Sequence, residues 1–374
     1  MMGRAKRSRR WFLRLFPAAI PLGAGLASET GEKGKVFPAE FKRYPDPTTE
    51  NVVIRLTDPA HTSLLPPTWA RPIAHRGNFL LYASDVTGRF EAFRMDLKSG
   101  QSRQLTEAAD LDPLSLALEP NEHGFLYLDG NQLVSANLSH LRTRVVYEIP
   151  AGFERGRGLS VAEDGQYAAL VEKQGERHRL QLLHIATGEA KVLADCGEEI
   201  RDPAPRPRRA SILYHRAGGA WLVDYDAAQN YRLHLADGET GTTLWSPDGH
   251  GVLYLNYPAD PHRLHNLREF TTDSNEDRAI ADTSQFIAFD RNADASVFVG
   301  ASGSKASPYV LLLVRAVKRE LTLAEHRSSD PAIISPVFSA NSQHIFFGSN
   351  QHGKPAIYHV SVAKFVEETG SNEP

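Results

Sequence analysis

The sequence contains one cysteine and little that favours helices. Cys196 is the only cysteine in 374 residues, so an internal disulfide is excluded. Beyond the N-terminal segment, no stretch has a long helical period of apolar residues, which argues against a mainly helical fold. The Gly-x-Ser-x-Gly motif of α/β-hydrolases is also absent. A hydrophobic content of 41% nevertheless predicts a folded globular protein.

The N-terminal segment is basic and contains no acidic residue before Glu29. Its six basic residues precede an apolar run from Leu15 to Ala27, which Pro17 and Pro21 interrupt. A run this short and interrupted is not expected to span a bilayer as a stable helix. We therefore expect no stable membrane insertion after the segment is removed. An uncleaved basic anchor is the alternative.

A short motif inside this segment suggests the route of export. Residues 8–13, SRRWFL, resemble the twin-arginine signal, whose paired arginines are recognised by a receptor. Gly25 and Ala27 are small residues at the two positions that a signal peptidase inspects, so we expect cleavage after Ala27. The sequence thus predicts a periplasmic or exported protein that is folded before export.

The remaining chain is acidic. Removal of the leader leaves 36 basic residues against 45 acidic ones, a net charge of −9. This charge argues against nonspecific nucleic-acid binding. We predict no nucleic-acid partner, and the sequence leaves the oligomeric state open.

Seven short apolar runs, each entered from a polar turn, recur along the chain. Their equivalent positions are separated by 40 to 48 residues and are Tyr82, Tyr127, Leu170, Tyr214, Tyr254, Val299 and Phe347. Several short strands in each repeat of this length are typical of propeller blades. The sequence predicts an all-β, seven-bladed β-propeller.

The two ends of the chain are expected to meet in the last blade. The C-terminal repeat supplies three strands but no fourth, while NVVIRLTD, residues 51–58, matches the fourth-strand pattern of the first repeat. We therefore expect residues 51–57 to complete the last blade and remove an exposed sheet edge. The predicted organisation is a signal peptide at 1–27, a linker at 28–50, a propeller at 51–363 and a tail at 364–374.

Function in a propeller usually lies on the loops that enter the first strand of each blade and on the turn between the second and third strands. The entering loops are expected at roughly 58–68, 108–115, 150–159, 195–207, 237–243, 281–286 and 327–335. His215 follows the apolar run of the fourth repeat, so it is expected to face the same mouth. His262 and His265 lie in a neighbouring insertion and are more simply explained as surface histidines.

Several stretches resemble the oligogalacturonate lyase family. These are GKVFPAEFKRYPDPTTENVVIRLTDPA (34–60), ILYHRAGGAW (212–221) and LWSPDGHGVLYLNY (244–257), and the likeness extends over about residues 34–362. The resemblance implies a seven-bladed propeller that cleaves short pectin fragments by β-elimination with a manganese ion. It also implies that His215 is the base and that Trp221 matches a family tryptophan.

The chemistry of elimination is consistent with these residue types. Histidine accepts a proton near neutral pH, and arginine pairs with a carboxylate and neutralises charge that develops beside it. We therefore predict His215 and Arg206 as catalytic residues, Arg206 because it is expected to begin the channel-lining strand. The predicted binding residues for an acidic oligosaccharide are Arg201, Arg208, Trp221, Gln285, His61 and Arg155.

The chain departs from the family in its expected metal ligands. Where the family has a Gln-x-x-His-x-His segment, this chain has Asp330, Ile333 and Ser335, and Gln285 stands where a further histidine is expected. We therefore assign no metal ligand, although the family implies manganese. Two functions remain open: a lyase that relies on arginine, and a non-catalytic propeller resembling the TolB-type module that binds protein or carbohydrate in the cell envelope.

The leader generates the first testable prediction. Intact-mass measurement of the exported protein is expected to give a chain that begins at Ser28. Replacement of both Arg9 and Arg10 by lysine is expected to leave the precursor in the cytoplasm, because the receptor recognises the arginine pair. Export of the double variant at the normal level would contradict the twin-arginine assignment.

Overall fold

The computed structural model describes residues 32–75 and 78–367, and in this part the chain is almost entirely β-structure. Two short 3-10 helices, η1 (Thr68–Ala70) and η2 (Pro331–Ile333), interrupt the described strands. None of the described helices has the length and apolar character needed to cross a bilayer. The predicted leader, residues 28–31 of the predicted linker and most of the predicted tail lie outside the described residues.

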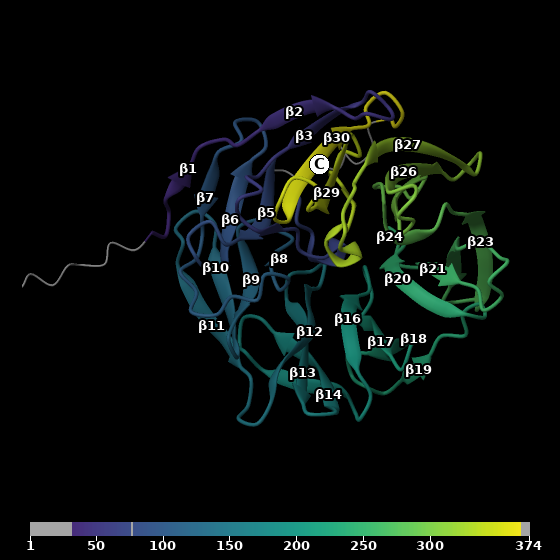
Figure 1. Cartoon of the computed structure of the whole chain (residues 1–374). Coiled ribbons are helices and arrows are strands. Elements are labelled where there is room, and N and C mark those ends of the chain that lie inside the picture. The colour runs from purple at the N-terminus through teal and green to yellow at the C-terminus, as the bar shows by residue number, and fades with distance from the viewer. Residues whose placement is uncertain (1–31, 76–77, 368–374) are drawn as a thin grey trace, which may run out of the picture. The chain divides into compact units, whose positions relative to one another are not determined.

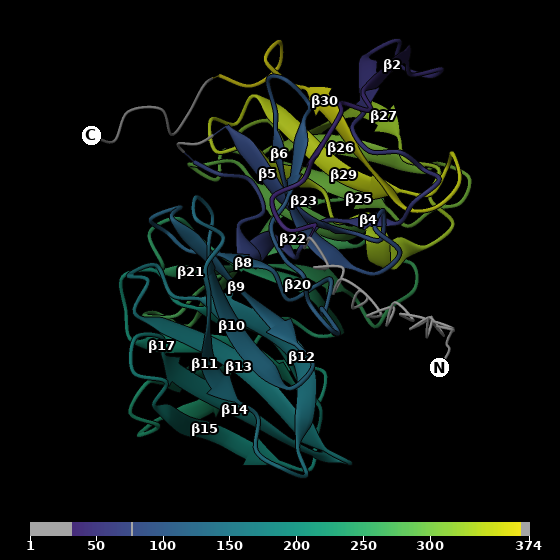
Figure 2. The same ribbon diagram turned by 90° about the vertical axis from the view of Figure 1, so that its left-hand side faces the viewer.

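The first two sheets follow one another along the chain. The first contains, in spatial order, β1 (Val36–Phe37), β7 (Ser102–Gln104), β6 (Glu91–Asp96), β5 (Phe79–Ser84) and β4 (Ser63–Leu64). The second contains β11 (Thr143–Glu148), β10 (Gln132–Asn137), β9 (Gly124–Asp129) and β8 (Ala117–Leu118). Figure 2 shows β9 to β11 next to the strands that follow them in the chain.

The third sheet has eight strands, where the sequence predicts two separate blades. Its order is β15 (Ala190–Cys196), β14 (Arg177–His184), β13 (Tyr167–Gln174), β12 (Glu154–Val161), β16 (Ile200–Pro205), β17 (Ser211–Arg216), β18 (Gly219–Asp224) and β19 (Asn230–Arg232). Each half is an antiparallel four-stranded meander, and the halves are joined by parallel pairing of Arg157 with Arg201. The described strands therefore form six sheets instead of seven.

The last three sheets complete the arrangement around a common centre (Figure 1). One contains β20 (Glu239–Trp245), β21 (Gly251–Tyr257), β22 (Asn266–Thr271) and β23 (Glu276–Asp282). The next contains β24 (Phe286–Arg291), β25 (Val297–Ser302), β26 (Tyr309–Val314) and β27 (Arg319–Glu325). The last contains β2 (Lys42–Pro45), β3 (Val52–Arg55), β30 (Ala356–Ser361), β29 (His344–Ser349) and β28 (Val337–Phe338).

The predicted closure is present. β3 lies in the segment expected to complete the last blade, and it pairs antiparallel with β30, with Val53 opposite Val360 (Figure 1). The segment expected to be a linker also contributes strands, since β2 extends this sheet beyond β3 and β1 extends the first sheet beyond β7. These strands were not predicted from the sequence because they are short: β1 has two residues and β2 has four.

Seven clusters of buried apolar side chains in the described residues lie between successive four-stranded units. One of them joins the last sheet to the first through Leu56, Tyr82, Phe93, Phe346 and Ile357. Burial of each large apolar side chain contributes about 1.5–3 kcal/mol before the entropy of ordering is subtracted. The ring is thus closed by packing as well as by strand pairing.

The sequence repeat reflects one buried position in the second strand of each unit. All seven repeat residues are at most 5% exposed. Where the residue is tyrosine, its hydroxyl often reaches a polar side chain at the edge of the core. Tyr82, Tyr214 and Tyr254 donate to Ser102, Asn230 and Asp277, over 2.9, 2.8 and 2.6 Å. An aromatic ring with a polar tip suits this half-buried edge.

Three of the predicted entering loops are wrong in part, because the first strands begin earlier than expected. β12, β16 and β20 cover much of 150–159, 195–207 and 237–243, and each has a register shift near its start. The glycine and proline residues that suggest loops lie in these bulges. Gly158 has φ +130°, and a Cβ atom there would lie 2.3 Å from Pro203 Cδ, so β12 and β16 approach too closely for a side chain.

Two neighbouring valines of β3 test the closure. Val53 is 1% exposed and Val52 is 57% exposed. Val53→Thr is expected to lower the free energy of unfolding by about 1–3 kcal/mol, because it buries a hydroxyl without a partner. Val52→Thr is expected to change the free energy by less than about 0.5 kcal/mol. Urea unfolding followed by tryptophan fluorescence measures both, and equal effects would show that β3 is not packed against the last sheet.

Candidate functional site

His215 is the penultimate residue of β17, and its ring is buried. The side chain is 2% exposed and points to the face of its sheet that packs against the sheet of β20. Its Nε2 atom lies 2.9 Å from Oγ1 of Thr243, on β20. Its Nδ1 atom is buried and has no hydrogen-bond partner among the described residues. Nε2 is therefore positioned by a hydrogen bond, while Nδ1 has no hydrogen-bond partner among the described residues.

Two arginines and one carboxylate lie beside this ring. Arg201 of β16 is paired across the strands with His215, and Arg157 of β12 is paired with Arg201. Asp202 accepts a hydrogen bond from Arg201 Nη1 at 2.5 Å and from Arg157 Nε at 3.1 Å. The Arg157 side chain remains 66% exposed. The junction of the two sheet halves thus brings together the histidine, both guanidinium groups and the carboxylate.

The environment strongly disfavours a charged His215. Burial is the main cause that lowers its pKa to about 4; the charges of Arg201 and Arg157 contribute to this shift, and that of Asp202 opposes it. A neutral imidazole at pH 7 is able to accept a proton. It is a weak base as long as both guanidinium charges act on it.

Arg206 is not placed beside His215, and the prediction that it begins the channel-lining strand is wrong. It follows the last residue of β16, whereas Arg201 lies near the first. Its guanidinium donates to Gly249 O at 2.6 Å and to Thr272 Oγ1 at 2.7 Å, and it stacks on the ring of Trp245. These bonds hold the turns at the far end of the strand. The predicted strand start was wrong because the proline-rich stretch after Arg201 is a bulged strand and not a loop.

Arg208 and Trp221 also lie away from the His215 ring. Arg208 is exposed in the turn between β16 and β17, at the opposite end of β17 from His215. Trp221 is paired with Tyr214, the residue before His215, so its side chain is on the opposite face of the sheet. There the indole packs against Arg216, whose guanidinium lies 4.6 Å from the ring centre.

The remaining predicted residues lie on other units. Arg155 bonds the loop before β8, donating to the carbonyl and the carboxylate of Asp110 over 2.8 and 3.0 Å. His61 lies between β3 and β4, and its Nδ1 is 3.8 Å from the Asp85 carboxylate of the first sheet. Gln285 is exposed immediately before β24, as expected for an entering loop. Of the predicted set, Arg201 is the residue that the structure brings to His215.

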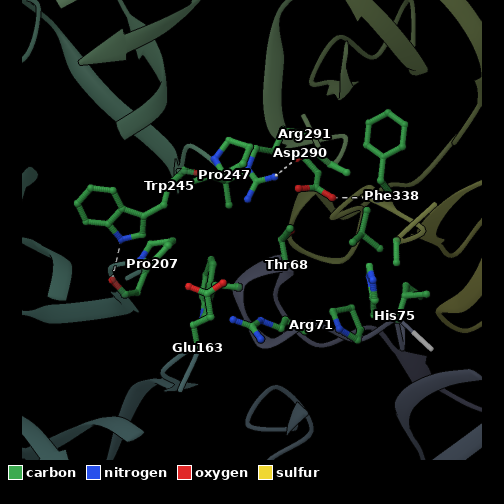
Figure 3. Close-up of a pocket in the computed structure, with 18 of the residues that line it drawn as sticks. Thr68, Arg71, His75, Glu163, Pro207, Trp245, Pro247, Asp290, Arg291 and Phe338 are labelled. Atoms are coloured by element: carbon green, nitrogen blue, oxygen red, sulfur yellow. Dashed lines mark hydrogen bonds between the residues drawn. The ribbon is translucent and has the colours of Figure 1, made fainter. Parts of the chain in front are cut away.

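A cavity of about 620 Å³ lies toward the C-terminal ends of the first strands of the units, away from the loops that enter these strands (Figure 3). It is lined by residues at or near the ends of β12, β16, β20, β24 and β28, and by η1 and the residues after it. Figure 3 shows Arg71 and Glu163 on one side of the space and Asp290 and Arg291 on the other. Thr243 lines the cavity and also bonds His215, so the two places share one residue.

The comparisons with known proteins point to one family. Residues 31–174 match the oligogalacturonate lyase family model. The chain is 23% identical to the oligogalacturonide lyase of Pectobacterium atrosepticum and 23% identical to the oligogalacturonate lyase of Dickeya dadantii. Each alignment covers 89% of this chain and 99% of the relative. These similarities support a relationship to this family.

Solved structures of similar proteins have the same fold. An oligogalacturonate lyase in complex with manganese superimposes with a TM-score of 0.83 at 22% identity, over 88% of this chain and 98% of that one. The oligogalacturonate lyase of Vibrio parahaemolyticus gives 0.82 at 21% identity, with the same coverage. The fold of the described residues is thus an all-β propeller.

The described residues do not fit a manganese site. Across 32–75 and 78–367, no three His, Cys, Asp or Glu side chains come together in a way that could hold a metal ion. At the positions where the family resemblance implies ligands, Asp330 caps η2 by accepting from Ala332 N at 2.9 Å, and Ile333 offers no donor atom. We therefore derive no step through a metal.

Sequence reasoning missed Thr243 and most of the cavity. Thr243 reaches His215 from the next sheet, and no sequence signal fixes that contact. Four lining residues were overlooked because function was sought at the entering loops and at the turns between second and third strands, whereas these residues lie at or near the opposite ends of the first strands: Arg71, Glu163, Asp290 and Arg291. The adjacent Asp290 and Arg291, which follow an apolar run, are a signal that could have found part of the cavity.

The buried imidazole generates a prediction about acid stability. In the unfolded chain this histidine binds a proton as the pH decreases through 6.5, whereas folded His215 binds one only near pH 4. The free energy of unfolding therefore decreases as the pH is lowered from 6.5 toward 4. Lowering the pH from 7 to 5 is expected to reduce the free energy of unfolding of the wild type by about 2 kcal/mol through this residue. His215→Gln is expected to lose that part of the pH dependence.

The matched control for this measurement is His262→Gln, because His262 is exposed. Urea unfolding at both pH values is expected to give this control the wild-type pH dependence. If His215→Gln and the wild type lose the same free energy between the two values, the imidazole is not buried in neutral form.

Proposed function

We propose that this protein is an exported, oligogalacturonate lyase-like enzyme that cleaves uronic-acid oligosaccharides by β-elimination. The observation that carries the proposal is the strand pairing that places His215 next to Arg201, and Arg201 next to Arg157, close enough for both charges to act on the imidazole, in a propeller similar to lyases of this family. We interpret the halves of the eight-stranded sheet as two blades, which gives seven. His215 then belongs to the fourth blade and Thr243 to the fifth.

His215 acts as the base in this proposal. Nε2–H donates to Thr243 Oγ1, and Nδ1 accepts the proton from the carbon alpha to the uronate carboxylate. The electron pair of that C–H bond forms the carbon–carbon double bond as the bond to the glycosidic oxygen breaks. The leaving oxygen takes a proton from water, and the imidazolium later returns its proton to solvent.

Arg201 and Arg157 neutralise the uronate carboxylate and the charge that develops on it. A guanidinium donates two parallel hydrogen bonds to a carboxylate, and preorganised charge stabilises an enolate-like transition state. Their charges also lower the pKa of His215. A bound carboxylate offsets these charges, so the imidazole becomes a stronger base when substrate is present.

Substrate reaches His215 only after a local movement. The ring is 2% exposed, while the Arg157 side chain is 66% exposed and that of Arg201 is 28% exposed. The carboxylate therefore meets the arginines first. We infer that pairing with the carboxylate draws the guanidinium groups away from Asp202 and opens the path to the ring.

Release of unsaturated product tests this function. With oligogalacturonate as substrate, ultraviolet absorbance is expected to rise with the wild type. His215→Gln is expected to lower kcat by roughly 10²–10⁴-fold, because the base is lost. Arg201→Met is expected to lower kcat/KM by roughly 10²–10³-fold. Arg142→Met, which replaces an exposed arginine in the turn just before β11, is the matched control and is expected to retain activity.

The pH profile separates a chemical role from a structural one. The acid limb of kcat/KM is expected near pH 4, with activity lost below it, and Arg201→Met is expected to move this limb to higher pH. EDTA is expected to leave the wild-type rate unchanged, since the described donor groups do not fit manganese. Binding of oligogalacturonate without any product would favour the non-catalytic propeller instead.

A further inference from the structure

The cavity at the other ends of the first strands has the size and lining of a small-ligand site. Its volume of about 620 Å³ is within the range of about 300–1,000 Å³ typical of such pockets. Its apolar lining includes the aromatic residues Trp69, Trp245 and Phe338. Flat apolar surfaces of this kind suit the carbon–hydrogen face of a sugar ring.

Arg71 is an unpaired cation in this cavity (Figure 3). It is exposed, and its side chain has no hydrogen bond or ion pair with any described residue, although the Glu163 carboxylate is close enough to act on its charge. Arg71 also ends η1 in the left-handed conformation, at φ 54° and ψ 61°. That conformation costs a non-glycine residue roughly 1–2 kcal/mol.

Arg291 is a second cation that no described carboxylate pairs with. Its Nε donates to Trp245 O at 2.8 Å and its Nη1 to Asn292 O at 3.2 Å, which fixes the guanidinium and leaves Nη2 without a described partner. Burial lowers the pKa of Arg291, the charge of Asp290 opposes this shift, and the charge of Arg71 adds to it, so the two guanidinium groups act on one another across the cavity. An anion between them would relieve this repulsion.

The cavity also has acceptors that disfavour a bare anion. Glu163 lines it, and so does Asp290, which is 7% exposed and accepts from Phe338 N at 2.8 Å. Burial raises the pKa of Asp290 to about 6. Carboxylates repel a simple anion but accept hydrogen bonds from hydroxyl groups. The lining therefore suits a ligand that has both a carboxylate and several hydroxyls.

We propose that this cavity is a second site, which binds a small acidic sugar of the uronate class. Its carboxylate is held by Arg71 and by Nη2 of Arg291, its hydroxyls donate to Glu163, and its apolar face lies against the tryptophan and proline side chains. The site shares Thr243 with the His215 cluster but uses none of the groups that bind or deprotonate substrate in the proposed elimination.

Calorimetric titration with galacturonate and with neutral galactose tests the site. Galacturonate is expected to bind the wild type, and galactose to bind at least about tenfold more weakly because the arginine contacts are lost. Binding is expected to persist in Arg201→Met, which removes a guanidinium of the His215 cluster. Arg71→Gly in that background is expected to weaken binding about tenfold or more.

The glycine variant also controls for folding. Glycine adopts the left-handed conformation without a steric penalty, so the thermal midpoint of Arg71→Gly is expected to be unchanged or higher. Arg142→Met is the matched control for loss of one positive charge. Equal binding of galactose, no binding of galacturonate, or binding that is lost in Arg201→Met and kept in Arg71→Gly would overturn the proposal. Each of these outcomes is independent of whether the wild type releases unsaturated product.

Discussion

The close approach of β12 and β16 determines the geometry of the His215 cluster. The two strands meet as a parallel pair at Arg157 and Arg201, where Gly158 leaves room for Pro203. A side chain at Gly158 would separate the strands, and Asp202 could then no longer accept from both arginines. The imidazole depends on the same approach, because Arg201 is its partner on the neighbouring strand. One backbone contact therefore controls both the position and the protonation of the proposed base.

The fold was predictable because its signal is repeated. A buried residue recurs at the same place in the second strand of each unit, and burial at that place requires an aromatic or branched apolar side chain. Closure was predictable for a related reason, since β3 has the composition of the strands that it replaces. The pairing of β12 with β16, which joins two units into one sheet, could not be predicted from the sequence, because it depends on one parallel contact that has no compositional signal.

The site was predictable only in part. His215 and Arg201 lie on adjacent strands, so a correct strand assignment is enough to bring them together. Arg206 was misplaced because bulges shift the start of β16, and a bulge of one or two residues has no periodic signal. Trp221 was wrongly placed at the site, because side chains alternate between the two faces of a sheet and Trp221 lies on the face opposite to His215. Contacts between sheets, such as that of Thr243, depend on packing that strand patterns do not encode.

The sheet that contains β3 and β30 has a consequence for biosynthesis. Ile357 N donates to Thr57 Oγ1 across 300 residues of chain. β3 therefore cannot pair with β30 until the ribosome has synthesised the C-terminal part of the chain. Until then β3 has an unpaired edge, which is a template for pairing with other nascent chains. Because contacts this distant in sequence form slowly, the last sheet is expected to assemble after the others. Slow release of the C-terminal strands would therefore prolong the period in which this protein is prone to aggregate.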